Sequence, residues 1–210
     1  MIERGALLRP ALLLGLLGLA AAVLLGGLNR LTEDRIVAER QQRALGAVSA
    51  MLEPGSYDND LLADRIEMAV PALSQTARVY RARSDGEPRA AVFDVTTEKG
   101  YSGPIRLLVA VDVEGRVIGV RVLSHRETPG LGDRIERGKS DWLTQFAGKS
   151  LGNPPAGDWA PDRRSGEFDT VTSATITSSA VIDAVKRVLQ TFESNRKKLF
   201  ATTENAEHTQ

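Results

Sequence analysis

The 210-residue sequence contains no cysteine, and this absence excludes several kinds of site. Without thiolates the chain has no disulfide framework, no thiolate zinc site, no all-cysteine iron–sulfur cluster and no thiol nucleophile. The two histidines, His125 and His208, lie far apart, which disfavours a histidine-based metal site within one chain. Lysine plus arginine and aspartate plus glutamate both number 27. Zero net charge argues against a nucleic-acid partner, which requires a basic surface.

The charges are unevenly distributed along the chain. Residues 10–29 (PALLLGLLGLAAAVLLGGLN) contain no charged side chain. A helix of this length spans about 30 Å, which matches the hydrocarbon core of a bilayer. We therefore expect a short tail over residues 1–9 and one transmembrane helix over residues 10–29, with membrane lipid as its surroundings. A cleaved signal peptide and a buried core helix are the alternatives.

Arginines on the two sides of this run do not decide its orientation. Arg4 and Arg9 precede it, and four arginines follow it within residues 30–43. The positive-inside rule is therefore equivocal, and long domains translocate largely regardless of charge.

The remaining residues have the composition of a soluble domain. Only Glu3, Arg4 and Arg9 are charged within residues 1–29, so 25 basic and 26 acidic side chains follow. Residues 30–56 form a membrane-proximal segment. Charged and apolar positions are interleaved over residues 31–52, which predicts a helix that ends near Pro54. Residues 57–76 are mixed in character, and residues 201–210 form a polar tail.

Two hairpins are predicted in the middle of the chain. Residues 78–83 and 90–96 flank Asp85-Gly86, and residues 105–113 and 116–123 flank Glu114-Gly115. Apolar residues alternate over 105–113, and further apolar residues on the other face suit an interior strand. Residues 140–148 predict a short helix and residues 152–166 a Pro/Gly-rich loop. Residues 179–200 predict a long amphipathic helix.

This order of elements predicts an α+β fold, an antiparallel sheet with packed helices, over residues 57–200. Upstream of the long helix, six of the eight residues from Thr172 to Ser179 carry hydroxyls. A helix N-terminus favours phosphate through its free N–H groups and its dipole. Capping and turn formation are the ordinary alternatives, and a hydroxyl nucleophile is a weaker one because no elbow motif or base accompanies it.

Two further segments are candidates for a ligand site. Residues 124–133 (SHRETPGLGD) follow a predicted strand and combine polar side chains with a tight Pro/Gly turn, although a turn with solvated charges would look the same. Residues 99–104 (KGYSGP) place Tyr101 between glycines, where it can stack on a planar ligand or cap the core. The glycines match neither a phosphate loop nor a dinucleotide fingerprint.

Together the segments resemble the G subunits of the Rnf (Rsx) ion-translocating electron transport complexes. The blocks that carry the resemblance are GYSGPIRLLVAVDVEGRVIGVRVLSHRETPGLGDRIE, SDWLTQFAGK and FDTVTSATITSSAVIDAVKR. The similarity runs from the N-terminal apolar run to about residue 190. The C-type component of the Na⁺-translocating NADH:quinone reductase is similar more distantly.

The resemblance implies a covalently bound FMN in an FMN-binding domain over residues 57–200. The family motif is approximately Asp-x-x-Ser/Thr-Gly-Ala-Thr, and its last threonine is joined to the FMN phosphate. The matching residues here are 169–175 (DTVTSAT), so the acceptor would be Thr175. Ser173 stands where the family has glycine, and serine is less free than glycine to adopt a positive φ.

The resemblance also implies contacts around the flavin. Glu127, Thr128 and Leu131 correspond to the loop that contacts the isoalloxazine, and Tyr101 falls near the ring. Ser173, Ala174 and Thr177 are expected to complete the cofactor site around Thr175. No metal and no catalytic acid or base of the protein is expected, since the redox chemistry belongs to the flavin.

The function implied is that of a single-flavin relay in the bacterial inner membrane, spanning it once with the flavin domain on the periplasmic side. The parent complex moves electrons between ferredoxin and NAD coupled to ion transport, or supports reduction of a redox-sensing regulator. Its other membrane and iron–sulfur subunits are the expected partners, together with a flavin transferase. The alternatives are a non-redox periplasmic assembly or binding subunit without flavin, and a secreted hydrolase.

Overall fold

A computed structural model describes residues 12–19, 21–24, 27 and 46–201. The chain divides into two compact units, residues 1–44 and 45–210. In the first unit residues 12–19 and 21–24 are helical and their leucines are exposed. Within the described residues no helix combines the length and apolar character of a membrane span. The expected tail at residues 1–9 and residues 202–210 of the expected polar tail lie outside the described residues. Of the helix expected over residues 31–52, residues 31–45 also lie outside them, residues 46–49 are helical, and the helix ends there rather than near Pro54.

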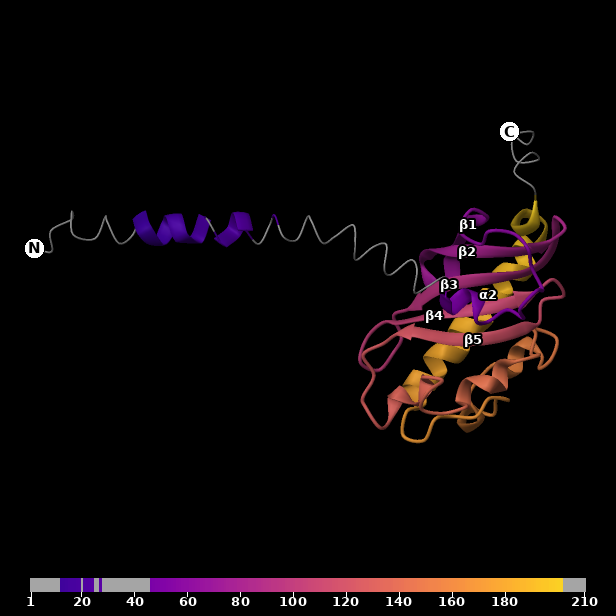
Figure 1. The fold of residues 1–210 in the computed structure, drawn as a ribbon. Coiled ribbons are helices and arrows are strands. Elements are labelled where there is room, and N and C mark those ends of the chain that lie inside the picture. Colours follow the sequence, from indigo (N-terminus) through magenta and orange to yellow (C-terminus); the bar gives the residue numbers. More distant parts are fainter. Residues whose placement is uncertain (1–11, 20, 25–26, 28–45, 202–210) are drawn as a thin grey trace, which may run out of the picture. The chain divides into compact units, whose positions relative to one another are not determined.

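The second unit contains one antiparallel sheet whose strands follow one another in sequence order (Figure 1). Both predicted hairpins are confirmed, and strand β4 is an interior strand as its apolar pattern predicts. The strands are β1 (Arg65–Val70), β2 (Gln75–Ser84), β3 (Glu87–Thr97), β4 (Ile105–Asp112) and β5 (Val117–Ser124).

The β2–β3 turn shows why Asp-Gly predicts a hairpin. Asp85 has a φ of 54° and Gly86 a φ of 79°. Two positive φ values are the signature of the type I′ turn, whose twist matches that of the flanking strands, and Asp-Gly accepts them at low cost. The β4–β5 turn likewise has Gly115 at a φ of 87°.

Strand β1 lies within residues 57–76, for which the sequence predicts no regular element. Its pattern is nevertheless readable: Ile66, Met68 and Val70 alternate with exposed residues and face the core. The strand is short, and Pro71 opens a 3-10 turn, η1 (Pro71–Leu73), directly after it. Strand β1 is thus an edge strand, and its sequence pattern consists of only three alternating apolar positions.

Helix α2 (Thr175–Phe200) crosses one face of the sheet (Figure 1). Its predicted apolar stripe is confirmed, because Val181, Ala184, Val185, Val188, Leu189 and Phe192 are all buried in the same core as the β3 and β4 side chains. The expected start at Ser179 is wrong, since the helix begins at Thr175. Nearby, Ser173 has a φ of 65°, which is incompatible with extending a right-handed helix further back.

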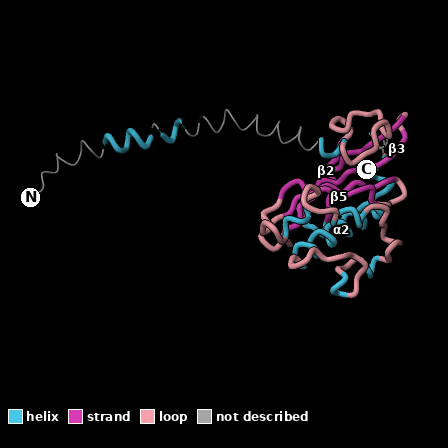
Figure 2. The backbone as a smooth tube through the Cα atoms, turned by 60° about the horizontal axis from the view of Figure 1, so that its bottom comes forward, coloured by secondary structure: helices cyan, strands magenta, loops and turns pink. Residues whose placement is uncertain are grey.

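The opposite face of the sheet is also covered, so the sheet is the middle of three layers (Figure 2). Small side chains on this face, three of them alanines, let the covering segment approach closely. The covering segment contributes Ala47, Val48, Leu52 and Leu61, and the sheet contributes Tyr80, Ala82, Ala90, Val92, Leu108 and Ala110.

An aromatic cluster supports the loops that lead into α2. Trp142, Phe146, Trp159 and Phe168 pack with neighbouring ring centroids 4.6–6.4 Å apart. The helix predicted over residues 140–148 is the 3-10 helix η3 (Trp142–Phe146), and the Trp142 indole Nε1 donates to the Asp169 carbonyl at 2.7 Å. The predicted loop over 152–166 carries two 3-10 turns, η4 (Ala156–Asp158) and η5 (Asp162–Arg164).

The far end of α2 is fixed by two arginines from β2. Arg81 Nη1 donates to the carbonyls of Leu199 at 3.2 Å and Ala201 at 3.0 Å, and Arg83 Nη2 donates to Phe200 at 3.2 Å. Asp64 pairs with both guanidinium groups. The last carbonyls of a helix lack partners within it, so these bonds anchor its C-terminal end to the sheet.

Replacing Phe168 tests the role of the aromatic cluster. Phe168→Ala removes a fully buried ring and is expected to lower the free energy of unfolding by about 3–5 kcal/mol. Urea unfolding of the full chain, followed by far-ultraviolet circular dichroism, measures this loss. The control is Tyr101→Ala, an exposed aromatic for which a change below about 0.5 kcal/mol is expected. Equal losses in the two variants would contradict the cluster's role.

Candidate functional site

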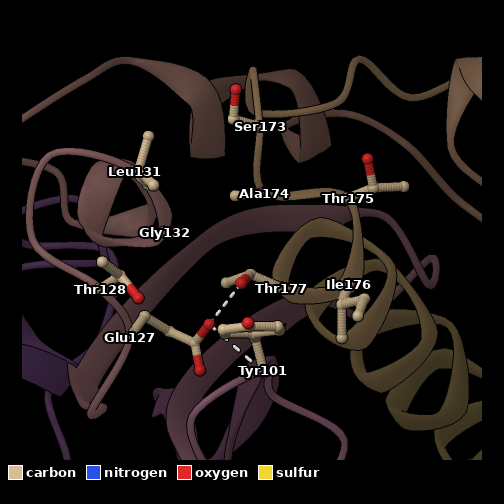
Figure 3. A pocket seen from close by; sticks show the side chains of 10 residues that line it. All are labelled: Tyr101, Glu127, Thr128, Leu131, Gly132, Ser173, Ala174, Thr175, Ile176 and Thr177. Carbon is tan, nitrogen blue, oxygen red and sulfur yellow. Dashed lines mark hydrogen bonds between the residues drawn. The ribbon is translucent and has the colours of Figure 1, made fainter.

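A cavity of about 520 Å³ lies at the N-terminal end of α2 (Figure 3). Three segments contribute to it: the β3–β4 loop, the loop after β5, and the turn that opens α2. All eight residues singled out by the sequence line it, and two others, Gly132 and Ile176, join them. The lining residues are Tyr101, Glu127, Thr128, Leu131, Gly132, Ser173, Ala174, Thr175, Ile176 and Thr177.

Glu127 joins the three segments. Its Oε1 accepts the backbone N–H of Ser102 at 3.0 Å, and its Oε2 accepts that of Tyr101 at 3.3 Å. The Thr177 hydroxyl donates to the same Oε2 (Figure 3). The residue is only 4% exposed, so the interpretation of this loop as a turn with solvated charges is wrong at Glu127. A buried carboxylate requires such bonds, because an unpartnered charge in the interior is strongly destabilising.

Two glycines make room for this carboxylate. A Cβ on Gly132 would lie 2.9 Å from the Glu127 Cβ and 3.2 Å from Thr177 Oγ1. A Cβ on Gly100 would lie 2.2 Å from the Gly103 carbonyl oxygen and 2.8 Å from Glu127 Oε1. Neither position has room for a side chain, so both require glycine. The sequence showed them only as part of glycine-rich turns.

Behind Glu127, the loop after β5 is held by a polar network. The Glu127 backbone N–H donates to His125 Nδ1 at 3.0 Å, and His125 Nε2 lies 2.9 Å from Glu136 Oε1. Because Nδ1 accepts, Nε2 carries the proton and donates to Glu136. Lys139 completes the network by donating to Glu136 at 2.8 Å and to Asp133 at 3.0 Å.

This network lowers the pKa of two carboxyl groups. Lys139, and secondly His125, lower the pKa of Glu136. The backbone N–H of Gly130, and secondly Lys139, lower the pKa of Asp133. Groups with a lowered pKa stabilise the fold above their ordinary pKa, and this contribution is lost as the pH falls through the lowered values. The loop that presents Glu127 is thus held more firmly at neutral pH than in acid.

The turn into α2 is shaped by Ser173 and Ser178. Ser173 adopts the left-handed region, with a φ of 65°. The buried Ser178 Oγ accepts the Val171 N–H and donates to the Ala174 carbonyl, both at 3.0 Å. Ala174 occupies the N-cap position without a side-chain cap, and the first turn contains no acidic residue. The capping role considered for the hydroxyl run is therefore absent at this terminus, whose first N–H groups have no acceptor within the helix.

The hydroxyls of the run are distributed unequally around the cavity. Thr177 and Ser178 are buried and hydrogen-bonded, and Ser179 donates to the Thr175 carbonyl at 2.8 Å. Thr172 does not line the cavity. Ser173 and the half-buried Thr175 are the two lining residues of the run whose hydroxyls have no hydrogen-bond partner within residues 46–201. Asp169, the first residue of the DTVTSAT segment, lies outside the cavity and acts through its backbone bonds to Trp142 and Gln145.

Three of the exposed residues that line the cavity are apolar, and Thr128 and Ser173 are the exposed polar ones. Four large apolar side chains are exposed within residues 46–201, and three of them line this cavity: Tyr101 is 68% exposed, Ile176 51% and Leu131 44%. The interpretation of Tyr101 as a cap on the core is therefore wrong. Ile176 carried no sequence signal of its own, because an apolar residue in a first helical turn is normally part of the core stripe.

These features favour ligand binding over hydrolysis. Glu127 and Tyr101 are the titratable side chains among the lining residues, and both Glu127 oxygens are engaged. His125 is turned toward Glu127 N and Glu136 and does not line the cavity. A hydroxyl nucleophile requires a base within hydrogen-bond reach, and neither Ser173 nor Thr175 has one among the described residues.

Comparisons with known proteins agree on one family. Residues 100–190 match the FMN-binding domain family, a range that contains all ten lining residues. The G subunit of the ion-translocating oxidoreductase complex of Pseudomonas aeruginosa is 44% identical over 209 residues, covering 98% of this chain and 97% of its own. The proteins of the same name from Salmonella typhimurium and Shewanella baltica are 42% and 34% identical, covering 82% and 96% of each chain respectively.

Among solved structures, the C-type component of the Na⁺-translocating NADH-quinone reductase from Parabacteroides distasonis is similar to this chain. The identity is 22% and the TM-score 0.41, with 69% of this chain and 70% of the other covered.

The backbone of Ser173 provides a direct test of the turn. A non-glycine residue in the left-handed region destabilises the folded state by about 1–2 kcal/mol. Glycine removes this strain but makes the unfolded chain more flexible, which offsets part of the gain in stability. Ser173→Gly is expected to raise the free energy of unfolding by up to about 1 kcal/mol, and Ser173→Val to lower it by more than about 1 kcal/mol. Thr172→Val, at an exposed neighbour without a positive φ, is the matched control. Urea unfolding measures all three, and a destabilised Ser173→Gly would contradict the assigned turn.

Proposed function

Since the chain belongs to the family of the G subunits of ion-translocating oxidoreductase complexes, we propose that it is an electron-carrying flavoprotein subunit that binds FMN in the cavity at the start of α2. The observation that carries the proposal is the convergence of three sequence-distant segments on one cavity, at a helix N-terminus that no side chain caps.

The residues present fit such a cofactor. The volume lies within the range of small-molecule sites, about 300–1,000 Å³. The open N–H groups and dipole of a 26-residue helix favour a phosphate at one end. Tyr101, Leu131 and Ile176 offer apolar contacts to a planar ring. Bound FMN would supply the electron transfer, and the chain binds it, orients it and shields it from water.

We place the covalent attachment at Thr175, as a phosphoester formed by a flavin transferase. Burial and existing hydrogen bonds support this choice against Thr177, Ser178 and Ser179. Thr175 is the first residue of α2, so a phosphate on its hydroxyl lies beside the free N–H groups of the first turn. Glu127, Thr128, Leu131 and Tyr101 then contact the ring, Ser173 and Ala174 complete the phosphate end, and Thr177 holds the Glu127 carboxylate in the cavity.

The surroundings of the subunit are part of the proposal. The uncharged run of residues 10–29 anchors the chain once in the bacterial inner membrane, and the flavin domain faces the periplasm. The names of its relatives describe a subunit of a larger ion-translocating complex. We therefore expect its partners to be the other membrane and iron–sulfur subunits, between which a single flavin relays electrons.

One observation favours a second candidate, a non-redox assembly or binding subunit without flavin. Ser173 occupies a position with a φ of 65°, where the family motif has glycine. The turn nevertheless forms with serine, and Ser173 lines the cavity. We therefore retain the flavoprotein as the proposed function.

In-gel flavin fluorescence separates the two candidates. The full chain, purified after co-expression with a flavin transferase, is expected to give a fluorescent band on a denaturing gel. Thr175→Ala is expected to abolish the band, while Ser194→Ala, which removes an exposed hydroxyl of α2 outside both the cavity and the DTVTSAT segment, retains it. A dark wild-type band would overturn the flavoprotein proposal. A fluorescent Thr175→Ala band would overturn the acceptor assignment alone.

A further inference from the structure

The cavity has opposite electrostatic character at its two ends. On one side lies the uncapped N-terminus of α2, with no acidic residue in its first turn. The Glu127 carboxylate lies further from the first residue of the helix, where it accepts the hydroxyl of Thr177 (Figure 3). In Figure 3 the Ser173 and Thr175 hydroxyls are well separated from this carboxylate, which lies beside Thr177 and Tyr101. A ligand that fills the cavity therefore meets a positive and a negative end.

The Glu127 carboxylate is buried but is not neutralised by a cation. It receives two backbone N–H groups and one hydroxyl, which are the partners of an ionised acceptor. None of the ion pairs within residues 46–201 includes Glu127. A charge on a residue that is 4% exposed is screened by water far less than a surface charge.

Resting on the proposed function, we propose that Glu127 sets the reduction potential of the bound flavin. The phosphoester at Thr175 places the phosphate at the helix N-terminus and leaves the ring at the Glu127 end of the cavity. The negative charge of Glu127 acts on the ring held at its end of the cavity and disfavours negative charge on that ring. Glu127 thereby makes the flavin a stronger reductant than the same cavity would without this carboxylate.

The chemistry behind this effect is a charge balance. The oxidised ring is neutral, and uptake of two electrons from a reductant with one proton from water leaves it with one negative charge. A neighbouring carboxylate raises the free energy of this charged form and leaves the neutral oxidised form nearly unaffected. The midpoint potential therefore falls. The oxygen atoms of Glu127 already accept three hydrogen bonds, so no proton of the protein is needed.

The first experiment removes the charge and keeps the shape. Dithionite titration of the flavin-loaded full chain, in the presence of a reference dye, gives the midpoint potential. Glu127→Gln is expected to shift it to more positive values. The matched control is Glu98→Gln, which makes the same charge change at an exposed residue of the same β3–β4 loop and outside the cavity, and which is expected to leave the potential unchanged.

Thr177→Val separates charge from structure. This variant removes the hydrogen bond that the Thr177 hydroxyl donates to Glu127 and leaves the carboxylate itself in place. A structural role for Glu127 predicts that Thr177→Val and Glu127→Gln shift the potential in the same direction. The electrostatic role predicts that Thr177→Val leaves the potential unchanged or makes it more negative.

A second pair of variants keeps the test valid if Glu127→Gln fails to fold. Thr128 is exposed, lines the same cavity and has no side-chain hydrogen bond within the described residues. Thr128→Asp adds a carboxylate and is expected to make the potential more negative than Thr128→Asn, its neutral counterpart.

The outcomes distinguish this inference from the proposed function. An upward shift confined to Glu127→Gln, or a lower potential in Thr128→Asp than in Thr128→Asn, supports the role of charge. A fluorescent wild type whose potential is unmoved by Glu127→Gln, or moved alike by Glu127→Gln and Thr177→Val, overturns it. If Glu127→Gln does not fold, equal potentials in the two Thr128 variants overturn it. A wild type without flavin overturns the proposed function itself.

Discussion

The site depends on the three hydrogen bonds accepted by the buried Glu127 carboxylate. They join the β3–β4 loop, the loop after β5 and the first turn of α2, and the bonded residues lie 25 to 50 positions apart in sequence. The cost of burying a charge makes this arrangement demanding, because losing one partner leaves a polar atom unsatisfied in the interior. The tight contacts of Gly100 and Gly132 are consequences of the same constraint.

The rest of the fold holds these three segments in place. Helix α2 is fixed at its C-terminal end by Arg81 and Arg83 and along its length by the core it shares with the sheet. The aromatic cluster holds the segment that precedes the helix through the Trp142 bond to Asp169. A site on such a scaffold is more sharply positioned than one on free loops.

Much of the fold could be predicted from the sequence because its signals are local. Alternating apolar residues and the Asp85-Gly86 and Glu114-Gly115 turns predicted strands β2 to β5, and the apolar stripe predicted most of α2. Strand β1 was missed because its three apolar positions are few and end at a proline. The start of α2 was placed too late because Ser and Thr also favour turns, and only the backbone around Ser173 shows where the helix begins.

The candidate site was less accessible to local reasoning. Composition and spacing marked three segments of interest, but only the family resemblance joined them, since contacts across 25 to 50 residues depend on the sheet. Gly132 matters because Glu127 and Thr177 pack closely against it, and Ile176 because its side chain is exposed at the cavity. Neither property can be predicted from the neighbouring residues in the sequence. The negative charge at one end of the cavity depends on the burial of Glu127. This burial could not be predicted from the sequence, because the residues next to Glu127 are charged or polar.

The central claim is that this cavity holds an FMN attached through its phosphate to the first residue of α2. Mass spectrometry of tryptic peptides from the full chain, co-expressed with a flavin transferase, tests it most directly. We expect the peptide containing residues 165–186 to carry the mass of one FMN less one water, and fragmentation to locate this mass on Thr175. An unmodified peptide, or a flavin located on another residue, would contradict it.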